Sequence, residues 1–340
     1  MKAKVAVVIL NWNGRKFLEQ FLPSVLEHSR DDADVIVADN ASEDDSVAFL
    51  KKNYPEVGVI LNKENGGFSK GYNDALTQVE ADYYVLLNSD IEVTENWIRP
   101  VVDMMEADEQ LAAVQPKILT FHDKGLFEYA GAAGGFIDKY GYPFCRGRLF
   151  QCMERDEGQY DDATEVFWAT GACMFVKADL YHKLGGLDED FFAHMEEIDF
   201  CWRLKNKGYK IMYCPHSKVY HVGGGTLPKS SSRKTYLNFR NNTYLMYKNL
   251  PGSRIWRVLV ARYFLDFVAS MKFLMQGGFK DFIAVIRAHG SFWKNFGKIK
   301  KKRKAIPHRY ISKIYKSNIA LDYFIKGKRK FLDLDQKKFS

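Results

Sequence analysis

The chain has 340 residues, 46% hydrophobic and 15% aromatic, which is enough apolar material for one large core with an appendage or for two domains. This composition excludes a disordered or collagen-like protein. The formal net charge of +8 is unevenly divided: residues 229–340 hold 27 Lys and Arg against 5 Asp and Glu, whereas residues 1–228 carry a net charge of −14. We therefore expect an acidic body followed by a basic region that seeks anions, such as nucleic acid, acidic lipid headgroups or an acidic polymer.

The first ninety residues alternate short apolar runs with helical patterns. Strands buried on both faces are expected at 5–10, 35–38, 57–61 and 83–87. Helices are expected between them at 15–28, 42–53 and 69–79. Ser42 is the expected cap of the second helix, and Pro23 predicts a kink or an early end in the first. This order predicts a parallel sheet covered by helices.

The pattern loosens from about residue 94. Helices are expected at 95–106, 178–184 and 195–207. Strands are expected at 112–119, 167–176 and 210–214. The stretch 125–158 is rich in Gly, Tyr and Phe and indicates hairpins and loops over the sheet edge. Gly208 is expected to end the helix at 195–207.

Helices without strands are expected after the glycine run at 223–225 and the Lys/Ser-rich stretch at 229–234. We predict a domain boundary there. The expected units are 1–228, with halves at about 1–92 and 93–228, and a basic helical region at 229–340.

An apolar stripe at helical spacing marks the basic region. Its members are Trp256, Val260, Tyr263, Phe267, Met271 and Leu274. Aromatic residues opposite Lys and Arg are typical of helices that lie on a membrane, and the basic run 298–304 favours anionic lipid. The alternative is that the stripe packs on the N-terminal domain or on a partner subunit. No uncharged apolar run reaches the roughly 18 residues of a membrane-spanning helix.

The five cysteines are odd in number and form no C-x-x-C pair, so neither a disulfide framework nor a zinc cluster is signalled. A reducing compartment is the simpler interpretation. The apolar run at 5–10 resembles the start of a signal peptide, but polar residues follow too soon for one, and a buried strand is expected instead.

Polar side chains follow each of the first four predicted strands. In an open parallel sheet, ligands bind outside the carboxyl ends of the strands. Asp39 can accept a hydrogen bond from a base or a ribose hydroxyl, and the turn at 65–67 lets backbone approach a ligand. Asp90 offers a hard oxygen ligand to Mg²⁺ or Mn²⁺. Singly, such residues are also ordinary turn formers.

These motifs, as an ordered set, resemble the nucleotide-sugar-binding half of family 2 glycosyltransferases of the GT-A fold. They are Val-Val-Ile-Leu-Asn-Trp-Asn at 7–13, Ala-Asp-Asn-Ala-Ser at 38–42, Asn-Gly-Gly-Phe at 65–68 and Asn-Ser-Asp at 88–90. Motifs at 171–174, 185–192, 196–203 and 221–224 resemble that family's rhamnosyltransferase-like branch. The resemblance covers roughly residues 4–250. It implies an α/β fold with a Rossmann-like, mostly parallel sheet, helices on both faces and a helical C-terminal region.

The resemblance also implies roles for the matched residues. Asp39 would hold the base or ribose, in a pocket lined by Asn11, Asn13, Asn65 and Gly67.

At the metal position, Asp90 would bind Mg²⁺ or Mn²⁺ at the donor's diphosphate, and His221 would complete that site. The family shows Asp-x-Asp here, whereas the first carboxylate is replaced by Asn88, which keeps an oxygen but loses a charge. A turn role for Asn88 and a structural role for His221 are the alternatives. The glycines after His221 suggest a loop that closes on the donor.

Glu197 is the candidate general base, because the family's Glu-Asp pair appears here as Glu196-Glu197. An inverting transfer needs a carboxylate to take the acceptor's proton. We expect the helix dipole to favour the Glu197 anion, and the alternative is that these acids merely complement the helix N-terminus. Weaker candidates for acceptor binding are Glu196, Asp199 and Trp168, the last of which would stack on a sugar or belong to the core.

The sequence thus predicts an inverting, metal-dependent glycosyltransferase that moves one sugar from a dTDP- or UDP-sugar to a lipid-linked or polysaccharide acceptor in cell-surface glycan synthesis. We expect it in the cytoplasm, attached peripherally to the inner face of the cell membrane through its C-terminal helices. The alternative is a nucleotide-regulated protein that binds nucleic acid through its basic tail. The tail lacks a recognisable RNA-binding signature and the body would repel a polyanion, so we expect no nucleic-acid partner. A processive synthase is disfavoured because no Gln-x-x-Arg-Trp motif is present.

Overall fold

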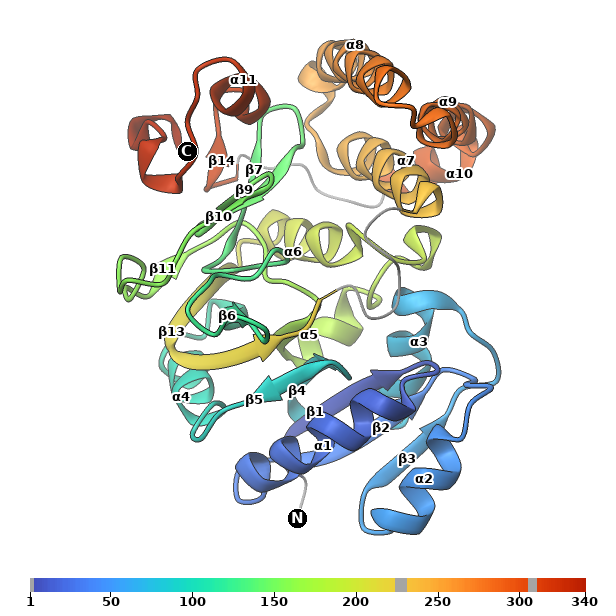
Figure 1. Ribbon diagram of the computed structural model, residues 1–340, viewed down its shortest axis with the longest axis vertical. Coiled ribbons are helices and arrows are strands. Elements are labelled where there is room, and N and C mark those ends of the chain that lie inside the picture. Colours follow the sequence, from blue (N-terminus) through green and yellow to red (C-terminus); the bar gives the residue numbers. More distant parts are fainter. Residues whose placement is uncertain (1–2, 224–230, 305–310) are drawn as a thin grey trace.

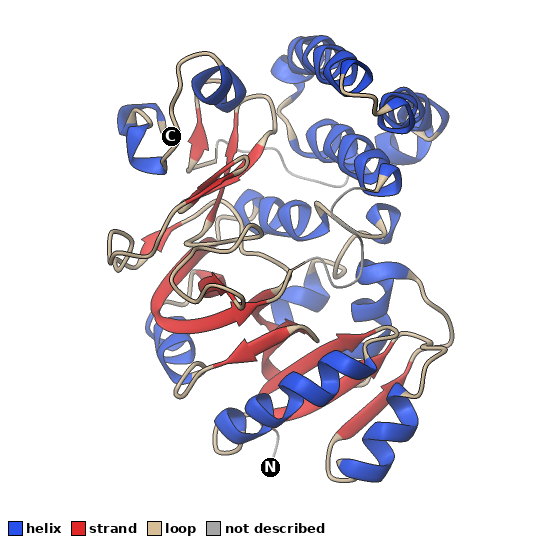
Figure 2. Ribbon diagram, viewed as in Figure 1, coloured by secondary structure: helices blue, strands red, loops and turns tan. Residues whose placement is uncertain are grey.

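The computed structural model describes residues 3–223, 231–304 and 311–340. A mixed sheet forms its centre (Figures 1 and 2). The strands of this sheet are β1 (Ala3–Asn11), β2 (Asp34–Asp39), β3 (Gly58–Leu61), β4 (Ala81–Asn88), β5 (Ile91–Val93), β6 (Leu111–Thr120), β11 (Thr164–Glu165), β12 (Cys173–Lys177) and β13 (Lys210–His221). Their order is β11-β13-β6-β12-β4-β1-β2-β3, and β5 pairs with β13.

The predicted mostly parallel sheet is confirmed in the N-terminal half. β1 pairs in parallel with β2 and β4, and β2 pairs in parallel with β3. Beyond β4 the direction reverses, because β12 is antiparallel to both β4 and β6, while β13 is parallel to β6. The first half thus has the connectivity of a nucleotide-binding sheet.

Helices cover both faces of the sheet and create two cores. One core contains α1 (Arg15–Ser29), α2 (Ser46–Asn53) and α4 (Arg99–Ala107). The other contains α3 (Gly67–Leu76), α5 (Ala178–Lys183) and α6 (Glu196–Asn206). The strand β1 serves both, since Val5 and Val7 belong to the first core while Ala6 and Val8 belong to the second. This explains why the strand is apolar without alternation.

Two predictions about the first helices are wrong in detail. α1 continues through Pro23 to Ser29, so the expected early end is wrong, and the kink stays a prediction. Pro23 and Glu19, whose carbonyl loses its helical partner, both lie on the exposed side, where that carbonyl is open to solvent. α2 begins at Ser46 after Asp45, and Ser42 is not its cap because it belongs to the loop that follows β2.

The strand β13 is longer than predicted, because it extends from Lys210 to His221 instead of ending at Cys214. Its pairing with β6 shifts register between Cys214 and Lys218, which accommodates Pro215 as a bulge. This extension carries His221 to the edge of the sheet where β5 begins.

A smaller sheet overturns the expectation that the C-terminal region contains helices without strands. It consists of β7 (Gly135–Asp138), β8 (Pro143–Cys145), β9 (Arg148–Leu149), β10 (Cys152–Met153) and β14 (Ile314–Tyr315). β14 comes from the C-terminal region and pairs in parallel with β7. A two-residue strand leaves no periodicity in the sequence, so this pairing could not be recognised.

The C-terminal region lies beside the second core and extends the molecule at one end (Figure 1). It contains α7 (Ser232–Asn249), α8 (Gly252–Met275), α9 (Phe279–Lys294), α10 (Phe296–Lys304) and α11 (Ile319–Phe324). Short 3₁₀ turns occur at Glu189–Phe191, Phe331–Asp333 and Gln336–Lys338. The core is continuous from α6 to Tyr244 and Phe292, and the boundary after residue 228 stays a prediction.

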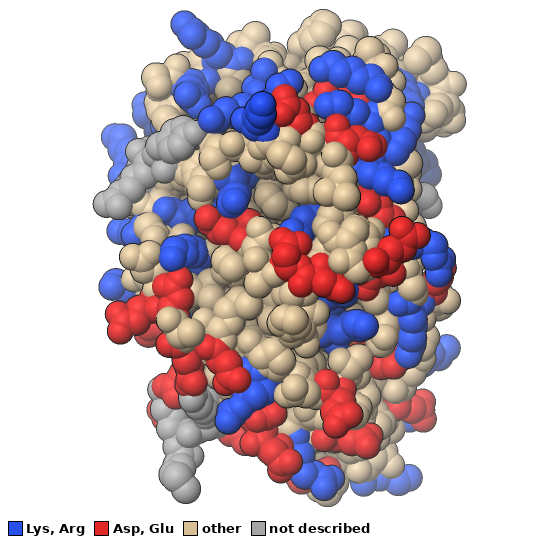
Figure 3. All heavy atoms as spheres, turned by 90° about the vertical axis from the view of Figure 1, so that its left-hand side faces the viewer, with Lys and Arg blue, Asp and Glu red and all other residues tan. Residues whose placement is uncertain are grey.

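Charge is distributed as the sequence predicts. On the face shown in Figure 3, Lys and Arg are frequent over the end formed by the C-terminal region, and Asp and Glu are more frequent over the rest. Within the part of the chain that the structure describes, no helix is both long and apolar enough to cross a membrane.

Candidate functional site

The polar strand ends meet at one edge of the central sheet. The register of β1 with β2 places Asn11 beside Asp39, and β4 brings Asn88 to the other side of β1. β5 starts directly after Asp90 and pairs with the end of β13, which brings His221 to the same edge. Five residues predicted from the sequence are therefore gathered by the sheet topology alone.

Asp39 is buried and both of its carboxylate oxygens accept hydrogen bonds. The Asn11 side chain donates to Oδ2 (3.0 Å), and the Ser42 backbone N–H donates to Oδ1 (2.9 Å). The Ser42 hydroxyl accepts from the backbone N–H of Asn13 (2.9 Å), and the Asn13 side chain accepts from that of Glu43 (2.7 Å). This network fixes the two loops around Asp39, and it gives Ser42 a part at the site that the sequence did not predict.

Asn65 belongs to a chain of side-chain amides. Asn62 donates to Asn40 (3.1 Å), and Asn40 donates to the Asn65 side-chain oxygen (3.0 Å), which also accepts from the Gly67 N–H (3.0 Å). Gly67 has φ +78°, and a Cβ there would lie 2.5 Å from the carbonyl oxygen of Phe192. The absence of a side chain at Gly67 therefore makes room for the backbone at Phe192, whereas the sequence predicts that this turn makes room for a ligand.

Gly67→Ala is expected to lower the free energy of unfolding by about 2–4 kcal/mol, because it combines a left-handed backbone conformation with a clash against Phe192. Gly185→Ala is the matched control, since Gly185 has φ +75° but a Cβ added to it would meet nothing within 4 Å. Urea unfolding of both variants measures the difference. Equal losses in the two variants would show that contact with Phe192 is not restrictive.

Asp90, His221 and Glu128 form a buried cluster at the end of β4. The His221 Nε2 atom lies 3.1 Å from Asp90 Oδ1, and its Nδ1 atom lies 3.5 Å from Glu128 Oε2. Burial alone would lower the pKa of His221, but the two carboxylates raise it to about 10. Burial raises the pKa of Asp90 and of Glu128, but the imidazolium charge of His221 lowers both by more. The pKa values of the two carboxylates therefore lie below their usual values. Asn88 Nδ2 lies 3.5 Å from His221 Nε2.

Glu128 is a residue of this site that sequence reasoning missed. It lies between β6 and β7 in the Gly-rich stretch, where neither periodicity nor a family motif distinguished it. Its side chain also accepts a hydrogen bond from the backbone N–H of Ala130. Among the described residues, no three or more His, Cys, Asp and Glu side chains are grouped so as to hold a metal ion.

Glu196 and Glu197 begin α6, as predicted. Burial raises the pKa of Glu197 to about 7, although backbone N–H groups at the helix start lower it. The expected stabilisation of its anion by the helix is thus present but weaker than the cost of burial. Burial and then the charge of Glu197 raise the pKa of Glu196 well above its usual value. The Oε2 atoms of both are buried without a hydrogen-bond partner among the described residues.

A short turn at Gly171 and Ala172 lies between Glu197 and the end of β4. A Cβ on Gly171 would lie 3.8 Å from the Cβ of Glu197. The next residue, Ala172, accepts a hydrogen bond at its carbonyl from the Asn88 N–H (2.9 Å). The turn therefore connects the carboxylate of α6 with the strand that carries Asn88 and Asp90.

The segment before Glu197 has an unusual backbone. Phe192, His194 and Met195 have positive φ values of 65°, 71° and 72°. Non-glycine residues adopt this region at a cost, so the surrounding structure must impose it.

Two residues of α7 hold this segment. Arg240 donates to the carbonyl oxygens of Asp190 and Phe191, both at 2.9 Å. The Asn241 side chain donates to three carbonyl oxygens, those of Phe191 (2.9 Å), Ala193 (2.8 Å) and His194 (2.7 Å). Sequence reasoning missed both residues. The signal available was an Arg-Asn pair inside a helix assigned to the attachment region, and the structure shows that this Asn is buried.

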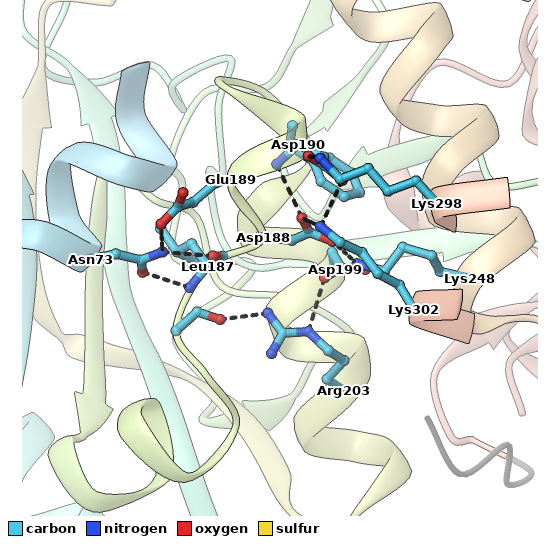
Figure 4. Close-up of polar contacts among 12 residues, drawn as sticks. Asn73, Leu187, Asp188, Glu189, Asp190, Asp199, Arg203, Lys248, Lys298 and Lys302 are labelled. Carbon is cyan, nitrogen blue, oxygen red and sulfur yellow. Dashed lines mark hydrogen bonds and ion pairs between the residues drawn. The ribbon is translucent and has the colours of Figure 1, made fainter. Parts of the chain in front are cut away.

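Asp199 does not lie at an accessible surface, which corrects its assignment to acceptor binding. It is fully buried and accepts from Arg203 (2.9 Å), Lys248 (3.0 Å) and Asn249 (2.8 Å). Lys248 also pairs with Asp188, and Figure 4 shows these groups from α6, α7 and the preceding loop pointing toward one another. The carboxylate joins α6 to the C-terminal region.

Trp168 lies in the core, which was the alternative to stacking on a sugar. Its side chain is 4% exposed and its indole N–H donates to the carbonyl of Phe136 (2.9 Å). A Cβ on Gly135 would lie 2.1 Å from the ring, so the tryptophan fills the space that this glycine leaves. A sugar has no access to the ring here.

The chain is similar to known glycosyltransferases. Residues 6–185 match the family described as Glycosyl transferase family 2. The chain is 24% identical over 231 residues to the N-acetylglucosaminyl-diphospho-decaprenol L-rhamnosyltransferase of Mycobacterium tuberculosis, covering 63% of this chain and 75% of the relative. It is 21% identical over 266 residues to the dTDP-rhamnosyl transferase RfbF of Shigella flexneri, covering 73% and 82%.

Solved structures share the fold. The mannosyltransferase PcManGT from Pyrobaculum calidifontis, solved in complex with GDP-Man and Mn²⁺, superposes with a TM-score of 0.52 at 15% identity, over 86% of this chain and 76% of that one. Together with the sheet order, this likeness confirms the expected GT-A architecture.

Proposed function

Because the chain is a nucleotide-sugar-dependent glycosyltransferase that belongs to glycosyl transferase family 2, in its rhamnosyltransferase-like branch, we propose that it transfers a single sugar, with inversion, to a lipid-linked or polysaccharide acceptor. The observation that carries this proposal is the meeting of four polar strand ends at one sheet edge, with a buried carboxylate of α6 close by. The Mycobacterium tuberculosis relative is named for a diphospho-decaprenol acceptor, which supports a lipid-linked acceptor in cell-surface glycan synthesis.

The donor nucleotide would lie at Asp39. Its buried carboxylate is held by Asn11 and by the loop that Asn13 and Ser42 fix, so it is preorganised to accept from a base or ribose. The Asn11 side-chain oxygen is buried without a partner among the described residues and offers a further acceptor. Asn65 and Gly67 shape this pocket from behind. The name of the Shigella flexneri relative supports a dTDP-sugar, and a UDP-sugar is the other candidate.

The residues at the end of β4 fit a divalent metal ion, Mg²⁺ or Mn²⁺. Asp90 and His221 would hold it, because carboxylate oxygen suits both ions and imidazole suits Mn²⁺ once His221 has given up its proton, which the charge of the ion favours. Glu128, on the far side of the imidazole, would orient the ring as a carboxylate commonly does behind a metal-bound histidine. Few protein ligands would be needed, since Mg²⁺ in phosphate-binding sites is commonly held by one or two carboxylates together with substrate phosphates and water. The ion would neutralise the charge that develops on the departing nucleoside diphosphate.

Glu197 would act on the acceptor. Its carboxylate takes the proton of the attacking hydroxyl while the new bond forms at the anomeric carbon, opposite the leaving diphosphate. A pKa of about 7 suits this task, because the group is partly ionised at neutral pH and still basic enough to accept a proton. Glu196 would lie beside the acceptor as a neutral neighbour.

The C-terminal helices would attach the enzyme to the inner face of the membrane. α8 exposes several large apolar side chains, with Val260, Phe264 and Met275 each more than 60% exposed. Such an apolar face beside Lys and Arg is typical of interfacial attachment to anionic lipid. If the wild-type protein does not float together with phosphatidylglycerol vesicles at physiological salt, this attachment is contradicted. The glycine-rich loop that we expected to close on the donor falls mostly at 224–226, outside the described residues.

Asp90→Asn tests the metal site and the reaction together. It is expected to lower sugar transfer at least about 100-fold and to abolish the response to added Mg²⁺ or Mn²⁺. Release of nucleoside diphosphate and the thermal shift caused by UDP with metal are the two measurements.

Glu92→Gln is the matched control, because it removes the same charge two residues along, where the carboxylate is partly exposed and forms an ion pair with Lys124. It should keep the metal response. An Asp90→Asn enzyme with full metal stimulation would contradict the metal site, and a wild-type protein that neither transfers nor hydrolyses any nucleotide sugar would contradict the function.

A further inference from the structure

A cavity of about 480 Å³ lies between α7 and α9 and is rich in cationic side chains. We call it the α7–α9 pocket. Its cationic residues are Arg233, Arg240, Lys280 and Arg287. The described residues that line it include no Asp or Glu. Asp281, next to Lys280 in sequence, instead accepts a hydrogen bond from Thr235 (2.6 Å).

Aromatic rings lie beside all three guanidinium groups of this pocket, including Arg240, which is 5.4 Å from the ring centre of Tyr236. Arg233 lies 5.1 Å from the ring centre of Phe192, and Arg287 lies 5.9 Å from that of Tyr236. The Tyr236 hydroxyl donates to Ser291 on α9 (3.0 Å), so the ring bridges the two helices. A guanidinium above a ring keeps its N–H groups at the edge, where they can bind an anion.

Counter-ions distinguish this pocket from its neighbour. The neighbouring cavity, of about 560 Å³, also contains several lysines, but Lys302 and Lys298 there pair with Asp188 and Asp190 (Figure 4). For Arg233, Lys280 and Arg287, by contrast, the described part of the chain supplies no ion pair. The α7–α9 pocket therefore has an unbalanced positive charge that favours an anionic ligand.

Apolar side chains lie next to the pocket on the same helix. Phe279 precedes Lys280 and is 62% exposed, and Ile286 precedes Arg287 and is 52% exposed. α8, which packs on α9, carries the further exposed apolar residues described above. A ligand with an anionic head and a long apolar chain would satisfy both kinds of surface at once.

We propose that the α7–α9 pocket binds the phosphate or diphosphate group of a lipid-linked acceptor, whose apolar chain lies along the exposed residues of α8 and α9. This subsite rests on the proposed function, because it deepens the acceptor side of the same reaction. Arg guanidinium groups bind phosphate oxygens in pairs, which suits a diphosphate. Phe192 lines the pocket and Arg240 anchors the segment that leads to Glu197, so a bound head group would hold the acceptor sugar near the candidate base.

The test compares two triple variants of the full-length protein. The pocket variant combines Arg233→Ala, Lys280→Ala and Arg287→Ala. The control variant combines Arg254→Ala, Arg257→Ala and Lys294→Ala, which removes the same charge from exposed positions of α8 and α9 outside the pocket. All six side chains are exposed, so both variants should fold.

Calorimetric binding of farnesyl diphosphate is measured with the donor site filled by saturating UDP and Mn²⁺. We expect wild type to bind it more tightly than farnesol or inorganic diphosphate. The pocket variant should bind it at least about tenfold more weakly, because charge-assisted hydrogen bonds are lost, and the control variant should stay within about twofold.

Four results would overturn the proposal: unchanged binding by the pocket variant, equal weakening in both variants, competition by UDP, seen as binding that appears only when UDP is omitted, and wild-type binding to phosphatidylglycerol vesicles that is as tight as its binding to farnesyl diphosphate. Equal weakening would indicate attraction by net charge, and competition would place the probe in the donor site. Binding of UDP with Mn²⁺ should be the same in all three proteins. If the wild-type protein does not bind UDP with Mn²⁺, the proposed function is contradicted instead. Failure of the subsite and failure of the proposed function are therefore distinguishable.

Discussion

Glu197→Gln is expected to lower kcat for sugar transfer by about 10²–10⁴-fold, the range that loss of a general base produces. KM for the donor should change little, because Glu197 would contact the acceptor hydroxyl, whereas the donor nucleotide would lie at Asp39. The substitution keeps the shape of the side chain, so the fold should be preserved. Steady-state release of nucleoside diphosphate, with and without acceptor, gives both constants.

The pH dependence of the wild type provides an independent check on Glu197. The folded pKa of about 7 lies above the ordinary glutamate value of 4.5, so the base is protonated and inactive over more of the acid range. The rate should therefore rise with pH and level off above about 7. Replacement by Gln should remove this acidic limb. Profiles of kcat from pH 5 to 9 measure it.

Glu196→Gln is the matched control, because Glu196 lies in the same helical turn, is at least as buried and carries the same functional group. It should keep transfer within about tenfold of wild type. If Glu196→Gln loses transfer and Glu197→Gln does not, the two roles are exchanged. Retention of the sugar's anomeric configuration in the product would contradict a single displacement altogether.

The donor side of the site was predictable because the topology of a parallel sheet brings the residues that follow each strand close to one another. Residues that directly follow parallel strands meet at one edge, so Asn11, Asp39 and Asn88 could be grouped from their positions alone. His221 required a family motif, since the strand that carries it passes a proline through a bulge. The same sheet order confirms the predicted fold class.

The residues that were missed act through contacts between distant segments. Glu128 approaches His221 from a loop 93 positions earlier in the numbering, and Asn241 reaches the backbone of a segment 47 to 50 positions before it. No periodicity or spacing signals such contacts. Asp199 shows the opposite error: beside two candidate site residues it resembles a ligand-binding acid, yet its burial with Arg203 of α6 and Lys248 of α7 gives it a packing role.

Lys248→Met is expected to lower the free energy of unfolding by about 3–5 kcal/mol, because it leaves two buried carboxylates without their shared cation. Lys248 lies 2.9 Å from Asp199 and also pairs with Asp188, and all three side chains are at least 93% buried. Burial raises the pKa of Asp188, but Lys248 and Lys302 hold it below its usual range. Methionine keeps the length and apolar stem of lysine, so the loss isolates the charge.

Lys298→Met is the matched control for this network. Lys298 pairs with Asp190, but its side chain is 60% exposed, so its removal should cost no more than about 1 kcal/mol. The deficit of Lys248→Met should also depend on pH. A carboxylate with a lowered pKa contributes stability above its unfolded pKa and loses it as the pH falls towards the folded pKa, so the gap from wild type should narrow between about pH 4, near the ordinary aspartate value, and about pH 2. Urea unfolding at both values measures the gap. Equal losses in the two variants, or a gap that stays constant with pH, would show that Lys248 contributes packing rather than charge.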